Sequence, residues 1–310
     1  MSLTLVEYAR TMPLGGERSM VNVWADEHPL WSRLPIETKQ SGIWSQLREQ
    51  RLPEVGFRKI NAEFAESTGE HTEIEDRVAI VGGDCDVDEA LIERGYDLDK
   101  QHVMKVKALS WAAGNAVMNG DSLSNVASYD GLKKRLDYSR TTLGQILSEG
   151  GTDGGDALQA SSLDILTSMV KGVNALIMTR AVLNLITAGS RTPAVMGNVQ
   201  FEPAALGGKV ATWNGIPILV IDPVDAHTVS LAFDELGGSG STATATSIYA
   251  VRFGIGGFFG FQVAPMRWNP NVPMSTTKRR GRLSWQLGVT FEDIFSVARL
   301  RNIGNLAMVA

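Results

Sequence analysis

The sequence predicts an α+β fold, and two stretches carry most of that prediction. Residues 97–118 form the longest helical pattern, because apolar or small side chains recur three and four positions apart after the N-cap candidate Asp97. The dipeptide Asn119-Gly120 then provides a stop signal. Farther along, Asn214-Gly215 separates two short apolar runs and is the strongest hairpin signal in the chain. A long helix and short strands in one chain indicate a mixed architecture.

The 97–118 helix is about 30 Å long at 1.5 Å per residue, roughly the width of a small domain. Lys100, Lys107 and Asn115 form its narrow polar side. The small residues Ala112-Ala113-Gly114 allow another backbone to approach closely. Taken alone, this is the pattern of an ordinary core helix that acts as a strut.

The second half of the chain alternates between helical and strand patterns. Helices are expected at 158–171 and 179–187, on either side of a buried strand at 175–178. Further strands are expected at 209–213, 216–221, 246–253, 258–264 and 282–289, and 291–302 fits either a strand or a short helix. Residues 149–156 read as a flexible connector, and the small polar residues of 233–246 predict a loop that is mobile or ordered only by a partner.

The first 54 residues have little regular pattern but contain large aromatic side chains. Trp24, Trp31 and Trp44 are spaced between prolines and glycines, whereas a disordered tail would lack such residues. We therefore expect an extended arm, with a short helix near 42–50, that buries its tryptophans against the same subunit or a neighbour.

A hairpin is expected next. Residues 55–64 and 74–81 each alternate in part between apolar and polar side chains, and the polar segment 66–71 lies between them. An isolated pair of strands is only marginally stable, so this hairpin needs another surface to lean on.

Three aspartates follow the hairpin. Asp84, Asp86 and Asp88 have the spacing of the first three ligands of an EF-hand loop. The rest of that loop fails, because its sixth position is Glu89 instead of glycine and its twelfth is Gly95 instead of glutamate. An N-terminal cap for a helix at 87–94 is the favoured interpretation, and a bound cation is the alternative.

Composition limits the class of protein. The chain has 310 residues, 44% of them apolar and 20% charged, which is typical of a soluble globular protein. The apolar runs are too short to span a bilayer, and Glu7 and Arg10 interrupt any secretory signal at the start. The single cysteine, Cys85, excludes an internal disulfide. A net charge of -5 argues against tight, sequence-independent DNA binding by the fold as a whole.

Sequence motifs for catalysis are weak. The four histidines are scattered without a metal-ligand spacing, at positions 28, 71, 102 and 227. The glycines of 254–260 resemble a dinucleotide loop, but a strand follows them instead of a helix, so a tight turn between strands is favoured. The basic cluster 278–282 is most often a solvated turn, although it could contact phosphate or an acidic patch of a neighbour.

An arm and a hairpin that cannot cover their own apolar residues favour self-assembly, since another copy supplies covering surface. The first function class is therefore a structural, self-assembling protein. The second is an enzyme or binding protein whose site has no recognisable pattern.

Several motifs in a fixed order support a family resemblance. They follow the hairpin and the long helix, and read YDGL (129–132), TWNGIPIL (212–219), TSIYAVRFG (246–254), LSWQLG (283–288) and VARLRNI (297–303). In this order the chain resembles major capsid proteins of tailed bacteriophages with the HK97-type fold, from about residue 55 to the end.

The resemblance implies a particular division of the chain. In this division the chain consists of an N-terminal arm, an E-loop hairpin, a peripheral domain with the spine helix 97–118, an axial domain, a return to the peripheral domain and a C-terminal segment. The corresponding ranges are 1–54, 55–83, 84–155, 156–255, 256–298 and 299–310. The spine helix would then pack its apolar rows on the peripheral-domain sheet and leave Lys100 and Lys107 facing solvent or packaged DNA.

The resemblance also implies a structural role. The protein would not be an enzyme and would have no catalytic, cofactor-binding or metal-binding residues. Its hexamers and pentamers would form an icosahedral shell around double-stranded DNA, contacted without sequence specificity. Scaffold, portal and decoration proteins would be further partners, a membrane would not, and the location would be the virion after assembly in the host cytoplasm. Encapsulins, which share the fold and enclose enzymes, are the alternative.

Overall fold

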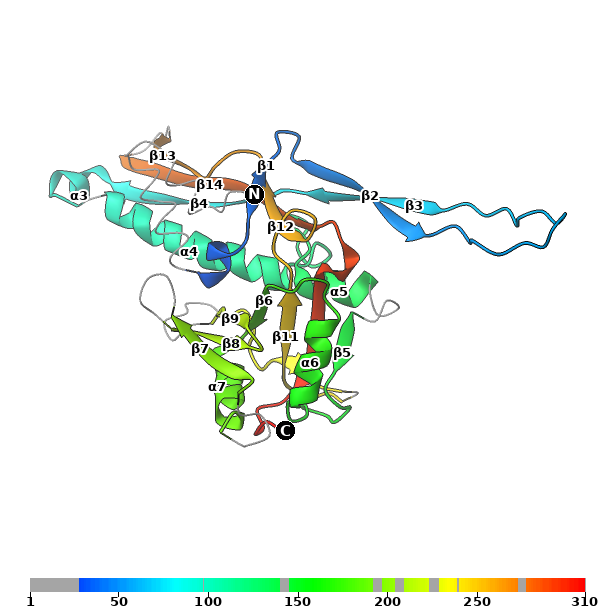
Figure 1. Cartoon of the computed structure of the whole chain (residues 1–310). Coiled ribbons are helices and arrows are strands. Elements are labelled where there is room, and N and C mark those ends of the chain that lie inside the picture. Colours follow the sequence, from blue (N-terminus) through cyan, green and yellow to red (C-terminus); the bar gives the residue numbers. More distant parts are fainter. Residues whose placement is uncertain are drawn as a thin grey trace.

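A computed structural model describes residues 28–96, 98–139, 145–191, 197–203, 209–222, 229–238, 240–272 and 277–309. Figure 1 shows two sheets joined by a long helix, with a two-stranded hairpin projecting far from both. The helices are η1 (Pro29–Ser32), α3 (Glu89–Glu93), α4 (Leu98–Asn119), α5 (Leu132–Ser139), α6 (Ala160–Ser168), α7 (Arg180–Gly189) and η3 (Ile294–Ser296). Within these described ranges, no helix is long and apolar enough to cross a membrane.

The first sheet, five-stranded over the described residues, is organised around one long strand. Its strands are β1 (Ile36–Thr38), β4 (Ala79–Asp88), β12 (Phe258–Gln262), β13 (Arg267–Val272) and β14 (Lys278–Phe291). β14 pairs antiparallel with β4, β12 and β13, while β1 adds to β12 in parallel. Glycines at 254 and 256 with positive φ form the turn before β12, which confirms the turn expected there.

The helix α4 lies along this sheet and contacts β4 and β14 (Figure 1). Val106, Leu109 and Val117 are buried in the core that it shares with the sheet, which confirms the predicted helix and its packing. The apolar rows of the helix also include Val103 and Met104, but these two residues near its N-terminus are 42% and 62% exposed. Asp97 and the side chain of Lys100 lie outside the described residues.

The second sheet contains eight strands in the described part of the chain. They are β5 (Ile146–Ser148), β6 (Ala175–Met178), β7 (Val199–Pro203), β8 (Lys209–Trp213), β9 (Ile216–Val220), β10 (Glu235–Leu236), β11 (Ala243–Val251) and β15 (Val297–Ile303). Their order is β5-β15-β11-β6-β9-β8-β7, with β10 on β11. α6 and α7 pack against this sheet around a second apolar core. Asn214 and Gly215 have φ values of 49° and 80°, as the predicted tight hairpin turn requires.

The polar segment 233–246 differs from its prediction as an unpacked loop. Its ends belong to β10 and β11, and Ala245 and Thr246 are fully buried. Asp153 in the glycine-rich connector accepts hydrogen bonds from the backbone nitrogen and Oγ1 of Thr242, at 2.9 and 2.8 Å. This segment is therefore attached to a second loop of the same chain through the hydrogen bonds between Thr242 and Asp153.

Candidate assembly surfaces

The most prominent surface is the projecting hairpin. It consists of β2 (Ile43–Arg51) and β3 (Glu70–Arg77), paired antiparallel from Ile43 opposite Arg77 to Arg51 opposite Glu70. The residues between them, 52–69, form its tip without strand structure (Figure 1). A projecting hairpin was predicted here, but its first strand was placed wrongly.

Two sequence expectations are corrected at the hairpin. Residues 42–50, expected as a short helix, form most of β2, because their backbone groups pair with β3. Residues 55–64, expected as the first strand, have no strand structure. Pro53 just before that segment and Gly56 within it interrupt an extended strand, and the alternating pattern at 55–64 therefore does not produce pairing.

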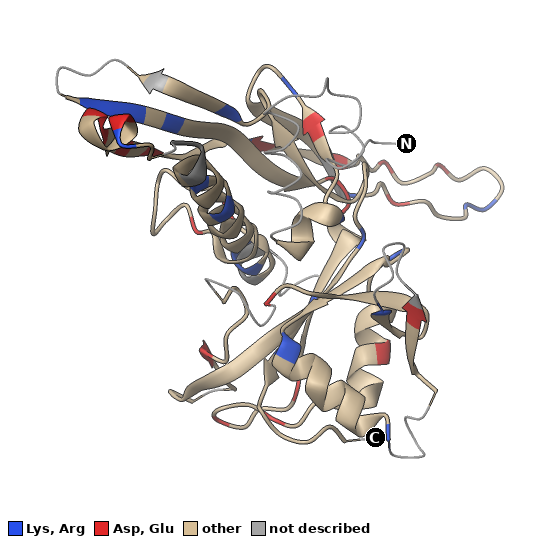
Figure 2. Ribbon diagram, turned by 90° about the vertical axis from the view of Figure 1, so that its left-hand side faces the viewer, with Lys and Arg blue, Asp and Glu red and all other residues tan. Residues whose placement is uncertain are grey.

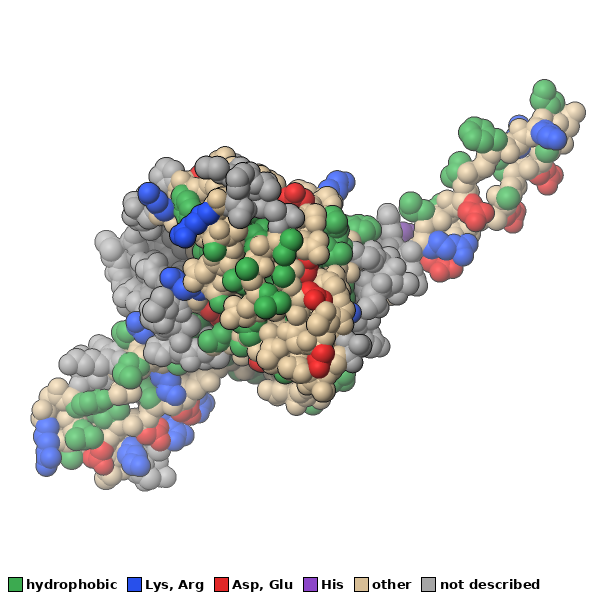
Figure 3. Space-filling view, turned by 90° about the horizontal axis from the view of Figure 1, so that it is seen from below, with side chains coloured by type: hydrophobic (Ala, Val, Ile, Leu, Met, Phe, Trp, Pro, Cys, Tyr) green, Lys and Arg blue, Asp and Glu red, His purple; other side chains and the backbone are tan. Residues whose placement is uncertain are grey.

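The tip exposes many apolar side chains. Val55 and Ile60 are 95% and 93% exposed, and Phe57 is fully exposed. Leu47, Leu52 and Phe64 extend this surface along the hairpin. Figure 3 shows apolar side chains along the projecting hairpin, away from the body of the molecule. Exposed apolar groups of this extent mark an interaction surface.

The hairpin also has a charge of its own. Between residues 52 and 75 the sequence has six glutamates and only two basic residues, Arg58 and Lys59. All six glutamates are exposed. A surface complementary to this hairpin would combine apolar contact with a positive or neutral rim.

The base of the hairpin, in contrast, is tightly attached. Trp44 packs edge-on against Phe259 of β12, with ring centroids 5.0 Å apart. The side chain of Gln46 donates a hydrogen bond to the backbone oxygen of Phe291, at 2.9 Å. Asp76 forms a 2.7 Å ion pair with Arg135 of α5. A fixed base sets the direction in which the tip projects.

A charged ladder lies at the opposite end of the five-stranded sheet. Arg280 holds both carboxylate oxygens of Asp86 at 2.6 and 2.7 Å, and Arg282 holds those of Asp84 at 2.7 and 2.8 Å. These hydrogen bonds hold the pKa of each carboxyl below its ordinary value. Figure 2 shows this basic part of β14 at the end of the sheet. The predicted basic cluster thus contacts an acidic patch of its own chain.

The favoured interpretation of the aspartate cluster, an N-terminal helix cap, is confirmed for its last member alone. Asp84 and Asp86 lie in β4, and only Asp88 caps a helix, by accepting a 2.9 Å hydrogen bond from the Ala90 nitrogen at the start of α3. In the described part of the chain, no three His, Cys, Asp or Glu residues lie close enough to hold a metal ion.

The arm packs on its own subunit where it is described. Trp31 is completely buried and donates a 3.2 Å hydrogen bond to the Ser110 oxygen of α4. Trp44 is half-buried against β12, and Trp24 lies outside the described residues. Two of the three expected anchors therefore contact the same chain.

The histidines do not come together where they are described. His28 is buried beside Trp111, His71 is exposed on β3, and His102 stacks on Trp268 with ring centroids 4.3 Å apart. His227 lies outside the described residues.

No family model and no curated protein matches the sequence. Solved structures do match. The holo-SrpI encapsulin complex from Synechococcus elongatus PCC 7942 is 14% identical with a TM-score of 0.65, covering 97% of this chain and 94% of that one. The capsid of a native GTA particle is 14% identical with a TM-score of 0.66, covering 90% and 91%. The chain from Mycobacterium phage Bobi is 10% identical with a TM-score of 0.57, covering 91% of each. These matches each cover at least nine tenths of both chains. Together with the strand order, the long helix and the projecting hairpin, they show that the chain has the HK97-type fold.

Proposed function

We propose that this protein is the major capsid protein of a tailed bacteriophage or a related particle. In this proposal, hexamers and pentamers of the chain close into an icosahedral shell around double-stranded DNA. The observation that supports it most is the fold match over at least nine tenths of both chains, since the phage and GTA structures are capsids or phage particles.

The exposed hairpin supports the same proposal. Two strands with an apolar tip are marginally stable alone, and another copy of the chain is the available source of covering surface. The hairpin then acts as the E-loop and lies on a neighbouring subunit. The five-stranded sheet with α4 acts as the peripheral domain, and the eight-stranded sheet acts as the axial domain.

The division of the chain and its other partners follow the same proposal. In this proposal the limits expected from the sequence shift at several points: the hairpin spans Ile43 to Arg77, β4 belongs to the peripheral domain, and β5 and β15 belong to the axial domain. Scaffold, portal and decoration proteins are the further partners, and packaged DNA is contacted without sequence specificity. The protein acts in the virion after assembly in the host cytoplasm and has no enzymatic activity.

The test is electron microscopy of the purified full-length chain. We expect uniform closed shells tens of nanometres across, and nuclease-protected double-stranded DNA in particles isolated from producing cells. A chain that remains monomeric at every concentration and ionic strength, also when co-expressed with the neighbouring genes of its locus, would contradict the proposal.

An encapsulin-type shell is the second candidate, because an encapsulin matches with a similar TM-score and covers more of this chain. The two candidates differ in what the shell contains. Protein cargo without nuclease-protected DNA would favour the encapsulin, and packaged DNA would favour the capsid.

A further inference from the structure

The short helix α5 contacts three separate parts of the molecule through consecutive basic residues. Lys133 pairs with Glu235 of β10 at 3.0 Å, Lys134 with Asp121 after the spine helix at 3.2 Å, and Arg135 with Asp76 of the hairpin at 2.7 Å. Successive helical residues point about 100° apart, so three neighbours can reach three different partners.

The Arg135 contacts attach α5 firmly to the base of the hairpin. Asp76 is only 8% exposed, so its carboxylate depends on the guanidinium for compensation. The same guanidinium donates a 3.0 Å hydrogen bond to the Val289 oxygen in β14 and lies over the Phe291 ring. Displacement of β3 therefore displaces α5 as well.

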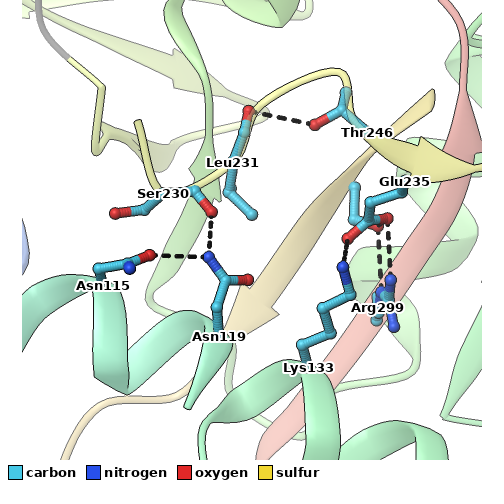
Figure 4. A network of polar contacts seen from close by, with 9 residues as sticks. Asn115, Asn119, Lys133, Ser230, Leu231, Glu235, Thr246 and Arg299 are labelled. Carbon is cyan, nitrogen blue, oxygen red and sulfur yellow. Dashed lines mark hydrogen bonds and ion pairs between the residues drawn. The ribbon is translucent and has the colours of Figure 1, made fainter. Parts of the chain in front are cut away.

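The Lys133 contact attaches α5 to the other sheet. Glu235 is 9% exposed and also binds Arg299 of β15 at 2.8 Å (Figure 4). The hydroxyl of Ser247 donates a further hydrogen bond to the Glu235 carboxylate. Burial opposes ionisation of Glu235, but Arg299, Ser247 and Lys133 together hold the pKa of the carboxyl below its ordinary value. Since Arg299 already neutralises Glu235, Lys133 is not needed to compensate that charge. Its distinct contribution is to join α5 to β10.

A second polar contact among the described residues joins the end of α4 to the segment before β10. A cavity of about 740 Å³ separates the end of α4 and α5 from residues 229–234, and Lys133 and Lys134 line it. Across it, Asn119 donates a hydrogen bond to the Ser230 oxygen (Figure 4). Lys133 and Asn119 therefore act at the edge of an open pocket, whereas Leu132 and Leu136 of α5 are buried in a core that also contains Tyr249 and Val297 of the eight-stranded sheet.

We propose that α5 couples the position of the hairpin to the eight-stranded sheet. The connection runs from Asp76 through Arg135 and Lys133 to Glu235. The proposal rests on the proposed function in one respect, namely that the hairpin docks on a neighbouring subunit. Docking then favours one arrangement of β10 in the subunit that supplies the hairpin. Coupling of this kind is reciprocal, so a change at β10 also alters the base of the hairpin.

The test is hydrogen exchange in the unassembled full-length chain. Lys133→Gln removes the ion pair between α5 and β10 but leaves the Glu235–Arg299 pair, and Lys134→Gln is the matched control because its partner is Asp121. We expect Lys133→Gln to speed exchange about threefold at both 235–236 and 70–77, as for loss of a partly exposed ion pair. Lys134→Gln should change neither segment.

A reciprocal variant makes the test two-sided. Asp76→Asn keeps the shape of the side chain at the hairpin base and should speed exchange at 235–236 as well as locally. Changes confined to the mutated element, or equal changes from Lys134→Gln, would overturn the proposal. Because exchange is measured on free subunits, failure of this coupling and failure to form shells are separate results.

Discussion

His28 is a buried histidine that packs against two tryptophan rings, Trp31 and Trp111, and against the backbone of α4 at Gly114. Its ring lies edge-on to Trp111 with centroids 4.7 Å apart, and its Nδ1 accepts a 3.3 Å hydrogen bond from the Leu30 nitrogen. Burial lowers the pKa of His28 to about 4. A charged imidazole therefore does not fit this position, which joins the arm to the spine helix.

We predict an acid-sensitive contribution of His28 to stability. As pH falls, the unfolded chain takes up this proton near the ordinary value of 6.5, whereas the folded chain does so only near 4. The contribution of neutral His28 to the free energy of unfolding is therefore fully present above pH 6.5. As pH falls from 6.5 to 4, the free energy of unfolding decreases by up to about 1.4 kcal/mol per pH unit. Urea unfolding at pH 7 and pH 5 measures it. His28→Gln should flatten this part of the dependence, and an unchanged slope would contradict the assignment.

Gly114 allows the His28 ring to touch α4. A Cβ at this position would lie 2.6 Å from Nε2 of His28. Alanine gains about 1 kcal/mol of helix propensity, but overpacking a filled site costs about 1–3 kcal/mol. We therefore expect Gly114→Ala to lower the free energy of unfolding by up to about 2 kcal/mol. In a His28→Ala background the same change should be neutral or stabilising, because the clash is gone.

At the scale of elements, local patterns predicted local structure well. The α4 helix and the β8–β9 hairpin follow from periodicity and from Asn214-Gly215, which act within a few residues. The Arg–Asp ladder was missed because its partners are 194 and 198 residues apart. Residues 42–50 were misassigned for the same reason, since only pairing with β3 makes them a strand. A detectable signal was present, namely matched alternation of aspartates at 84 and 86 with arginines at 280 and 282.

The two sides of α4 should respond differently to charge. Val106→Asp would bury a carboxylate without a partner in the core against the sheet, because Val106 is 1% exposed. We expect loss of the cooperative thermal transition. Met104→Asp on the same helix is the control, because Met104 is 62% exposed, and it should unfold near the parent temperature. Equal effects of the two substitutions would contradict the packing described for α4.

At the scale of the whole molecule, the hairpin is separate from the folding core. Phe57→Ser with Ile60→Ser removes exposed apolar surface from the tip without touching either core. We expect an unchanged thermal midpoint for the free subunit and a strongly reduced yield of shells in electron micrographs. Thr68→Ser in the same tip is the control and should assemble normally. Normal shell yield from the double variant would show that the tip is dispensable.

The sheet pairings also impose an order on protein synthesis. β1 pairs with β12 and β4 pairs with β14, so strands from the first third of the chain wait for partners between residues 258 and 291. The ribosome must therefore make most of the chain before the base of the hairpin is fixed. Chains terminated before residue 258 lack β12 and β14, so the sheet that holds the base of the hairpin cannot form. Under the proposed function, this topology would act as a length check that keeps incomplete subunits out of the shell.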